Sequence, residues 1–252
     1  MMHRYFIYLS YIGKNYHGWQ IQPNGIAVQE VLVTALETIL RYEVTIVGAG
    51  RTDTGVHAKR MVAHVDTIAP LENTTDFVYK LNSLLPNDVA VDKVVSVKLN
   101  AHARFDAISR TYEYWVVPNK NPFLHDYATR IFFELDYPAM HKAAQQLLNY
   151  TDFTSFSKLH TQVKTNNCTI QEARWEQRGY VWVFTIKADR FLRNMVRAIV
   201  GTLFKVGRGE LSEADFVDII ESKNRKNAGM SAPAEGLYLV DVSYPKEIFN
   251  YK

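Results

Sequence analysis

The residues from Gly48 to Ala58, GAGRTDTGVHA, hold the groups of this chain that are best suited to chemistry. One carboxylate, Asp53, follows a cation, Arg51, by two residues in a glycine-rich loop. Glycine adopts backbone angles that are closed to other residues, and it lets another chain approach closely. A carboxylate in such a loop can be presented to a bound substrate while a nearby cation keeps it ionised. The pattern therefore predicts a nucleophile or general base at Asp53.

Three other interpretations of this loop remain open on its pattern alone. Arg51 and Asp53 could form a structural ion pair in a hairpin, since ion pairs also perturb carboxylates. A phosphate cradle is disfavoured because no Gly-Lys-Ser/Thr follows the glycines and no helix pattern begins there. A metal site is weaker still, because the spacing of His57 and His64 fits no zinc signature.

A tyrosine on an expected strand is a second candidate for chemistry. Ser109 to Val117 has the composition of a strand, and on it Arg110, Tyr112 and Tyr114 share one face. A tyrosine in a strand usually serves in packing. From the pattern alone Tyr112 is a packing residue.

A pair of arginines on an expected helix is a third candidate. Apolar residues recur at helical spacing from Phe191 to Val206, with Arg193 and Arg197 one turn apart on the flank of that apolar face. The pattern alone favours two arginines that face solvent.

The elements that must position these residues alternate between strands and helices. We expect strands at 4–11, 44–47, 61–65, 89–99, 109–117, 170–177, 180–187 and 237–242. We expect helices after Gly25, at 76–85, from Pro138, at 191–206 and from Ser212 to Ile220, the last opened by a capping box of Ser212 and Asp215. Each half of the chain therefore mixes several strands with about two helices, which is consistent with α+β halves built on antiparallel sheets.

Composition places the chain among folded proteins of a reducing compartment. The 252 residues are 47% hydrophobic and 22% charged, and no apolar run approaches the roughly 20 residues of a membrane span. A single cysteine, Cys168, excludes an internal disulfide framework, suits the cytoplasm, and is interpreted as structural.

The net charge of +3 neither establishes nor excludes a nucleic-acid partner, so the distribution of charge matters more. Cations gather in the second half: Lys158, Lys164, Arg174, Arg178, Arg190, Arg193, Arg197, Lys205, Arg208, Lys223, Arg225 and Lys226. The chain also holds 15 Tyr, 13 Phe and 4 Trp. Rings that stack on bases beside cations that track phosphates are typical of proteins that bind nucleic acids.

Besides the Asp53 loop, five ordered blocks of this sequence resemble a known family. They are YIGKNYHGWQ at 11–20, HARFDAISRTYEYWV at 102–116, DFTSF at 152–156, ADRFLRNMVRAIVG at 188–201, and AEGLYLV at 234–240. Together they are similar to the pseudouridine synthases, in the branch typified by tRNA pseudouridine synthase A.

The resemblance implies a fold of two similar α+β halves, related by a pseudo-two-fold, whose mainly antiparallel sheets join across a central cleft. We expect residues 1–104 to form the half that carries the Asp53 loop. Residues 105–252 would form the half that carries Tyr112 and the Arg197 helix.

The resemblance also implies a role for each candidate residue. Asp53 would be the catalytic carboxylate, Tyr112 the ring that stacks on the target base, and Arg197 the cation that holds Asp53 ionised and oriented. Arg51 would contact RNA near a nucleotide flipped out of its stack. A local salt bridge of Arg51 remains its alternative.

The activity implied is isomerisation of uridine to pseudouridine in the anticodon stem-loop of tRNA, at consecutive positions just 3′ of the anticodon. Neither cofactor nor metal is required, and the protein would be a cytoplasmic homodimer that does not enter a membrane. Two rival functions remain: an RNA-binding module without catalysis, and a metal-dependent phosphoesterase. The first has no use for an intact Asp53 loop, and the second needs clustered carboxylates or histidines.

Overall fold

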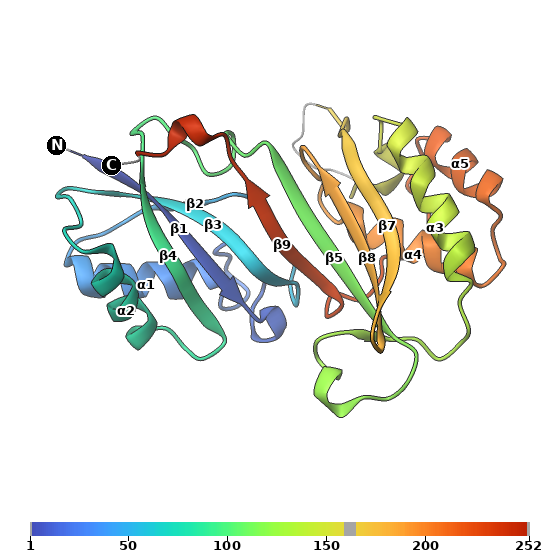
Figure 1. Ribbon diagram of the computed structural model, residues 1–252, viewed down its shortest axis with the longest axis horizontal. Helices are drawn as coiled ribbons and strands as arrows, with labels where there is room; N and C mark the ends of the chain where they lie inside the picture. The colour runs from blue at the N-terminus through green and yellow to red at the C-terminus, as the bar shows by residue number, and fades with distance from the viewer. Residues whose placement is uncertain (1, 159–164, 251–252) are drawn as a thin grey trace. The chain divides into compact units, whose positions relative to one another are not determined.

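The computed structural model describes residues 2–158 and 165–250, which divide into two compact units (Figure 1). Among these residues, 2–108 and 239–250 form the first unit, and the described part of 109–238 forms the second. The division therefore falls four residues after the expected boundary at 104, and residues 239–250 belong to the first unit.

The first unit is built around three long antiparallel strands. β1 (His3–Tyr11) pairs with both β3 (His57–Thr67) and β4 (Val89–Val97), and the short β2 (Ile46–Gly48) pairs with β3. Next to β3 the sheet continues with β9 (Leu237–Ser243), whose residues from 239 onward belong to this unit. Helix α2 (Thr74–Leu84) packs on β4, and α1 (Val28–Leu40) contacts α2 and β2.

The second unit repeats this combination of strands and helices. β8 (Val181–Ala188) pairs antiparallel with β5 (Ser109–Val117) and β7 (Ile170–Arg178), and the two-residue β6 (Thr129–Arg130) runs parallel to β5. Helix α3 (Tyr137–Gln146) packs on β7 and contacts α4 (Met195–Gly207) and α5 (Glu213–Glu221). The predicted α+β class with mainly antiparallel pairing is confirmed.

Short 3₁₀ helices occupy several of the connections in both units. They are Gly13–Asn15, Pro122–Leu124, Leu147–Asn149, Thr154–Phe156 and Lys246–Ile248.

Helix ends follow local capping chemistry where the sequence shows it. The Ser212 hydroxyl accepts from the backbone N–H of Asp215 at 3.1 Å, and the Asp215 carboxylate accepts from the N–H of Ser212 at 2.7 Å, which confirms the predicted capping box. At the start of α3 the Asp136 carboxylate accepts from the N–H of Ala139 at 2.8 Å as a simple N-cap.

The predicted start of α4 at Phe191 is wrong by four residues. Asn194 is left-handed, with φ of 65°, and this conformation cannot continue a right-handed helix. The helix begins at Met195, so Arg193 lies before it and is exposed. Arg193 and Arg197 therefore do not share a helical flank.

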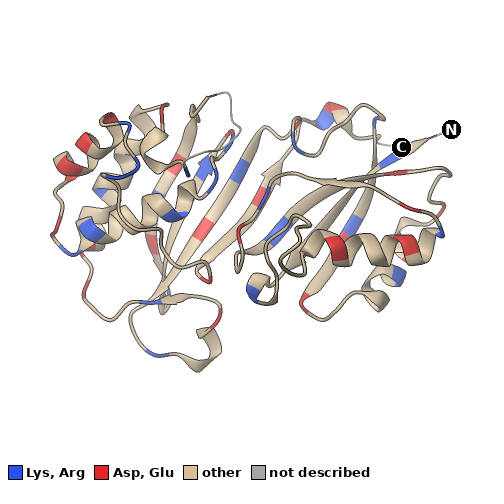
Figure 2. Cartoon of the chain, turned by 180° about the vertical axis from the view of Figure 1, so that it is seen from behind, with Lys and Arg blue, Asp and Glu red and all other residues tan. Residues whose placement is uncertain are grey.

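Charged residues of both signs are interspersed over each unit (Figure 2). Several cations of the second half are paired: the guanidinium of Arg174 contacts Glu172 and Glu176, and Arg208 contacts Glu210 at 2.8 Å. Lys164 lies outside the described residues. No helix in the part of the chain that the structure describes is long and apolar enough to cross a membrane.

Candidate active site

The Asp53 loop connects β2 to β3 and closes in a tight turn. The backbone N–H of Val56 donates to the carbonyl of Asp53 at 3.1 Å, and Gly55 has φ of 80°, a conformation that favours glycine. Thr52 and Val56 are buried, whereas Asp53 is half-buried and Arg51 is exposed. The loop thus buries the residues beside Asp53 and leaves the carboxylate and the neighbouring guanidinium at the surface of the first unit.

The end of β1 and the segment after it fix this loop on both sides of Asp53. Before the carboxylate, the Tyr11 hydroxyl bonds the Thr52 hydroxyl at 2.8 Å, and the N–H of Trp19 donates to the Thr52 carbonyl at 3.3 Å. After it, Nδ1 of His57 accepts from the N–H of Gly13 at 3.0 Å. The block at 11–20, which the sequence singled out without a role, therefore serves as the support of the Asp53 loop.

Two glycines of that block permit the close contact. A Cβ at Gly13 would lie 2.0 Å from the carbonyl oxygen of Val56. A Cβ at Gly18 would lie 2.3 Å from that of Thr52, and Gly18 also has φ of 84°. Gly50, in the loop itself, is not required by close packing, because a Cβ there would meet no atom within 4 Å. The glycines that sequence reasoning stressed are thus only part of the set that shapes the loop.

Tyr112 lies on β5 of the second unit, opposite Ile186 of β8. Its ring is half-buried and packs edge-to-face on Phe191, with ring centroids 5.1 Å apart. Tyr114 on the same strand is fully buried, and its hydroxyl donates to the carbonyl of Pro233 at 2.9 Å. Burial also raises the pKa of Tyr114. Tyr114 is therefore the packing residue of this strand, whereas part of Tyr112 remains accessible.

Arg197 lies in the first turn of α4 and is half-buried. Its Nε donates to the carbonyl of Ala232 at 2.7 Å. The alternative of a simple solvent-facing arginine is therefore wrong for Arg197. Among the four candidates, Asp53 and Arg51 belong to the first unit, and Tyr112 and Arg197 belong to the second.

Histidines of the first unit serve as hydrogen-bond acceptors. Nδ1 of His64 accepts from the N–H of Ala103 at 3.1 Å, and Nδ1 of His102 accepts from the N–H of Arg104 at 3.1 Å. Burial, helped by the charges of Arg4 and His102, lowers the pKa of His64 to about 4 against the opposing carboxylates Asp66 and Asp106. His64 is therefore neutral at neutral pH and holds the loop that follows β4.

The described residues include no group of three His, Cys, Asp or Glu side chains that could hold a metal ion. Cys168 is buried, and burial raises the pKa of its thiol to about 12. The thiol stays protonated at neutral pH, which agrees with its interpretation as structural.

The profile of a protein family described as tRNA pseudouridine synthase matches residues 7–106 and 143–245. The chain belongs to this family. The matched ranges include Arg51, Asp53 and Arg197, whereas Tyr112 lies in the stretch between them.

Individual relatives cover nearly the whole chain. A tRNA pseudouridine synthase A of Parabacteroides distasonis is 58% identical over 98% of this chain and 98% of its own length. Another, from Bacteroides fragilis, is 59% identical over 98% of each chain. A more distant one from an Exiguobacterium species is 37% identical over 97% of this chain and 99% of its own.

Sequence reasoning missed the residues that support the site. The contacts of Thr52, Gly13, Gly18 and Ala232 depend on segments distant in sequence, so local pattern carries no sign of them. One feature of the sequence could have indicated these supporting residues: the spacing of small and aromatic residues in the block at 11–20. That block resembled the family, but no role was assigned to it.

Proposed function

We propose that this chain isomerises uridine to pseudouridine in tRNA, at consecutive positions in the anticodon stem-loop just 3′ of the anticodon. Membership of the tRNA pseudouridine synthase family supports the activity. The observation that carries the assignment of the site is the Asp53 loop itself, which is intact in sequence and held on both sides by buried hydrogen bonds. An RNA-binding module without catalysis has no use for such a loop.

The proposed reaction is balanced within the nucleotide. The bond from C1′ of the ribose to N1 of the ring breaks, the base turns, and a bond from C1′ to C5 forms. C5 loses its proton and N1 gains one. The enzyme must therefore hold a detached base in place, and it must first reach a base that is normally stacked by flipping the nucleotide into a pocket.

Each candidate residue takes one part of this task. Asp53 acts as the nucleophile or base, and Arg197 orients that carboxylate through its planar guanidinium. The ring of Tyr112 stacks on the target base, which its partial exposure and its place on the paired strand β5 support. The exposed Arg51 contacts the RNA beside the flipped nucleotide.

The proposal extends to assembly and compartment. The protein is a homodimer in the cytoplasm, where its tRNA substrate is found and where a single buried cysteine stays reduced. Sedimentation of the purified protein tests the dimer directly.

One incubation separates the proposed function from its rivals. The protein is mixed with unmodified tRNA and a metal chelator, and the RNA is then digested and its nucleosides analysed. New pseudouridine, mapped to the anticodon stem-loop, is the expected result. Bound but unconverted tRNA would support the RNA-binding module, and shortened RNA would support a phosphoesterase. Pseudouridine elsewhere in the tRNA would keep the activity and overturn the proposed target positions.

A further inference from the structure

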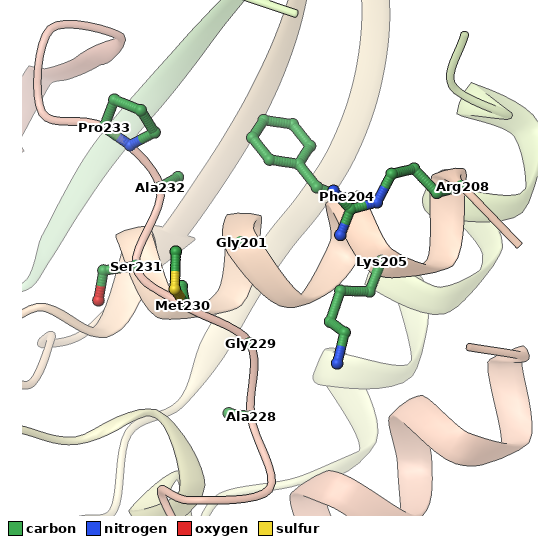
Figure 3. A pocket seen from close by; sticks show the side chains of 10 residues that line it. All are labelled: Gly201, Phe204, Lys205, Arg208, Ala228, Gly229, Met230, Ser231, Ala232 and Pro233. Carbon is green, nitrogen blue, oxygen red and sulfur yellow. The ribbon is translucent and has the colours of Figure 1, made fainter. Parts of the chain in front are cut away.

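An extended segment of the second unit, Ala228–Pro233, runs directly along the backbone of α4 at Gly201 (Figure 3). A Cβ at Gly201 would lie 1.7 Å from the carbonyl oxygen of Met230, so no other residue fits there without displacing the segment. A Cβ at Gly229 would in turn lie 2.8 Å from the carbonyl oxygen of Gly201. Two glycines therefore let two backbones meet without side chains between them.

The segment and the helix exchange hydrogen bonds at Arg197. The N–H of Ala232 donates to the carbonyl of Arg197 at 2.9 Å, and Nε of Arg197 donates to the carbonyl of Ala232 at 2.7 Å. One turn further along α4, the buried Thr202 hydroxyl accepts from the N–H of Gly229 at 2.9 Å. The guanidinium of Arg197 is thus tied to a carbonyl whose own position is set by the helix.

Side chains and a strand fix the segment from its other sides. The Ser231 hydroxyl accepts from the side-chain amide of Asn194 at 2.6 Å and from Arg225 at 3.2 Å. The carbonyl of Pro233 accepts from the Tyr114 hydroxyl, and that of Gly236 accepts from the N–H of Trp115 at 2.8 Å. Tyr114 and Trp115 belong to β5, the strand that carries Tyr112. The segment therefore links the helix of Arg197 to the strand of Tyr112.

We propose that the segment Ala228–Pro233 positions Arg197 for catalysis, and that Gly201, Ser231 and Asn194 are positioning residues that act through it. The inference rests on the proposed function, in which Arg197 orients Asp53. A guanidinium bonded at Nε to a fixed carbonyl is restricted about its last torsions, so its two terminal nitrogens point in one direction. Such fixed orientation is what a planar, two-point grip on a carboxylate requires.

This role also accounts for parts of two matched sequence blocks that the role of Arg197 alone does not explain. The block at 188–201 ends on Gly201, where the segment crosses the helix. The block at 234–240 begins just after Pro233 and includes Gly236, where a Cβ would lie 2.7 Å from the Thr129 hydroxyl and 2.8 Å from the Tyr114 ring.

The test uses Gly201→Ala and Ser231→Ala in the full chain. A hollow of about 400 Å³ borders the segment and leaves room for it to move when a methyl group is added at Gly201. We expect the single-turnover rate of Gly201→Ala with saturating enzyme to fall on the order of 10- to 100-fold, as misplacement of a catalytic group does. Ser231→Ala, which removes hydrogen bonds without adding bulk, should lose roughly 3- to 10-fold. The dissociation constant for tRNA should stay within about threefold in both variants, since the segment acts on turnover.

Gly207→Ala on the same helix is the matched control. Its added Cβ would meet side-chain atoms, the sulfur of Met140 at 2.5 Å and Leu135 at 2.8 Å, and would leave the segment in place. Its thermal midpoint should fall while its rate stays near that of the wild type. An equal loss of rate in Gly207→Ala would mean that general destabilisation explains Gly201→Ala, and the inference would be overturned.

A double variant separates this inference from the proposed function. Lysine at position 197 lacks Nε of a guanidinium, so Gly201→Ala should cost less than about threefold in an Arg197→Lys background if the glycine acts through that bond. The same large cost in both backgrounds overturns the positioning role. If Arg197→Lys is impaired while Gly201→Ala and Ser231→Ala are normal, the positioning role is likewise wrong but the function of Arg197 stands. If Arg197→Lys itself turns over normally, the assigned role of Arg197 fails and the inference fails with it.

Discussion

Tyr112 is the residue whose surroundings best separate a functional role from a packing role. Its strand neighbour Tyr114 is fully buried and bonded through its hydroxyl, whereas the ring of Tyr112 is half-buried against Phe191. If the ring stacks on the target base, Tyr112→Phe should keep most of the activity. Tyr112→Ala should lose at least about fivefold in turnover, because stacking of this kind contributes about 1–3 kcal/mol.

Single-turnover rates on tRNA check this expectation, with Tyr180→Ala as the control because Tyr180 is 87% exposed in the turn between β7 and β8. If Tyr112→Phe and Tyr112→Ala both fail alike, the hydroxyl transfers a proton. Near-normal rates in both variants would show that Tyr112 is a packing residue only.

His64 makes the stability of the first unit depend on pH. Burial lowers the pKa of His64 in the folded protein to about 4, below its ordinary value of 6.5. The unfolded chain therefore binds the proton first, and stability present above pH 6.5 is lost as the pH falls toward 4. Between pH 7 and pH 4.5 we expect the free energy of unfolding to decrease by about 2 kcal/mol from this residue.

Urea unfolding at several pH values measures the effect. His64→Asn keeps an oxygen acceptor near the N–H of Ala103 but does not titrate, so its stability should change less over this range. An unchanged slope in His64→Asn would show that other groups carry the pH dependence.

At the scale of elements, the site depends on one arrangement: the segment after β1 supports the Asp53 loop. Gly18→Ala would place a Cβ 2.3 Å from the Thr52 carbonyl in a left-handed backbone, with φ of 84°. We expect the loop to shift and turnover to fall on the order of 100-fold, since a displacement of about 1 Å has that effect on catalysis.

Gly50→Ala in the loop itself is the matched comparison, because its Cβ meets no atom within 4 Å. It should retain most of the turnover, and both variants should show cooperative thermal unfolding. A Gly18→Ala variant with normal turnover would mean that the loop does not need this support.

The elements themselves were largely predictable because they depend on local chemistry. β5 was predicted with its observed bounds, and the Ser212 capping box placed the start of α5. The start of α4 was not predictable from periodicity, because a left-handed Asn194 interrupts a sequence that otherwise reads as helical. That conformation is accompanied by a hydrogen bond to Ser231, 37 residues away in sequence.

The candidate site was predictable as residue types but not as an arrangement. Asp53, Tyr112 and Arg197 were chosen from motif and resemblance. The contacts that hold them join residues far apart in the sequence. Tyr11 bonds Thr52, beside Asp53, across 41 residues, and Arg197 bonds Ala232 across 35 residues. Such contacts follow from the tertiary fold, which no local spacing encodes.

At the scale of the whole molecule, binding of tRNA should be governed by phosphate contacts despite a net charge of only +3. The logarithm of tRNA affinity should fall linearly with the logarithm of salt concentration, because each phosphate contact releases counterions. Arg193 and Arg51 are both exposed, so changing either one to Gln should reduce that slope by about one.

Fluorescence anisotropy over a salt series measures the slope. Lys80→Gln is the control, since Lys80 lies on α2 and pairs with Asp76 at 2.7 Å. An affinity that does not respond to salt would exclude a binding surface dominated by cations and phosphates.

The central claim is that Asp53 carries out the isomerisation of uridine, and loss of hydrogen from C5 of the ring reports that reaction directly. The substrate is tRNA with tritium at C5 of its uridines, and the measurement is tritium released to water in a single turnover. The wild type should release it, and an exposed control in the same unit, Asp92→Asn, should do the same. Asp53→Asn should bind the tRNA with nearly unchanged affinity and release tritium at less than about one hundredth of the wild-type rate. Release by Asp53→Asn at a tenth of the wild-type rate or more would remove Asp53 from the chemical step and contradict the account.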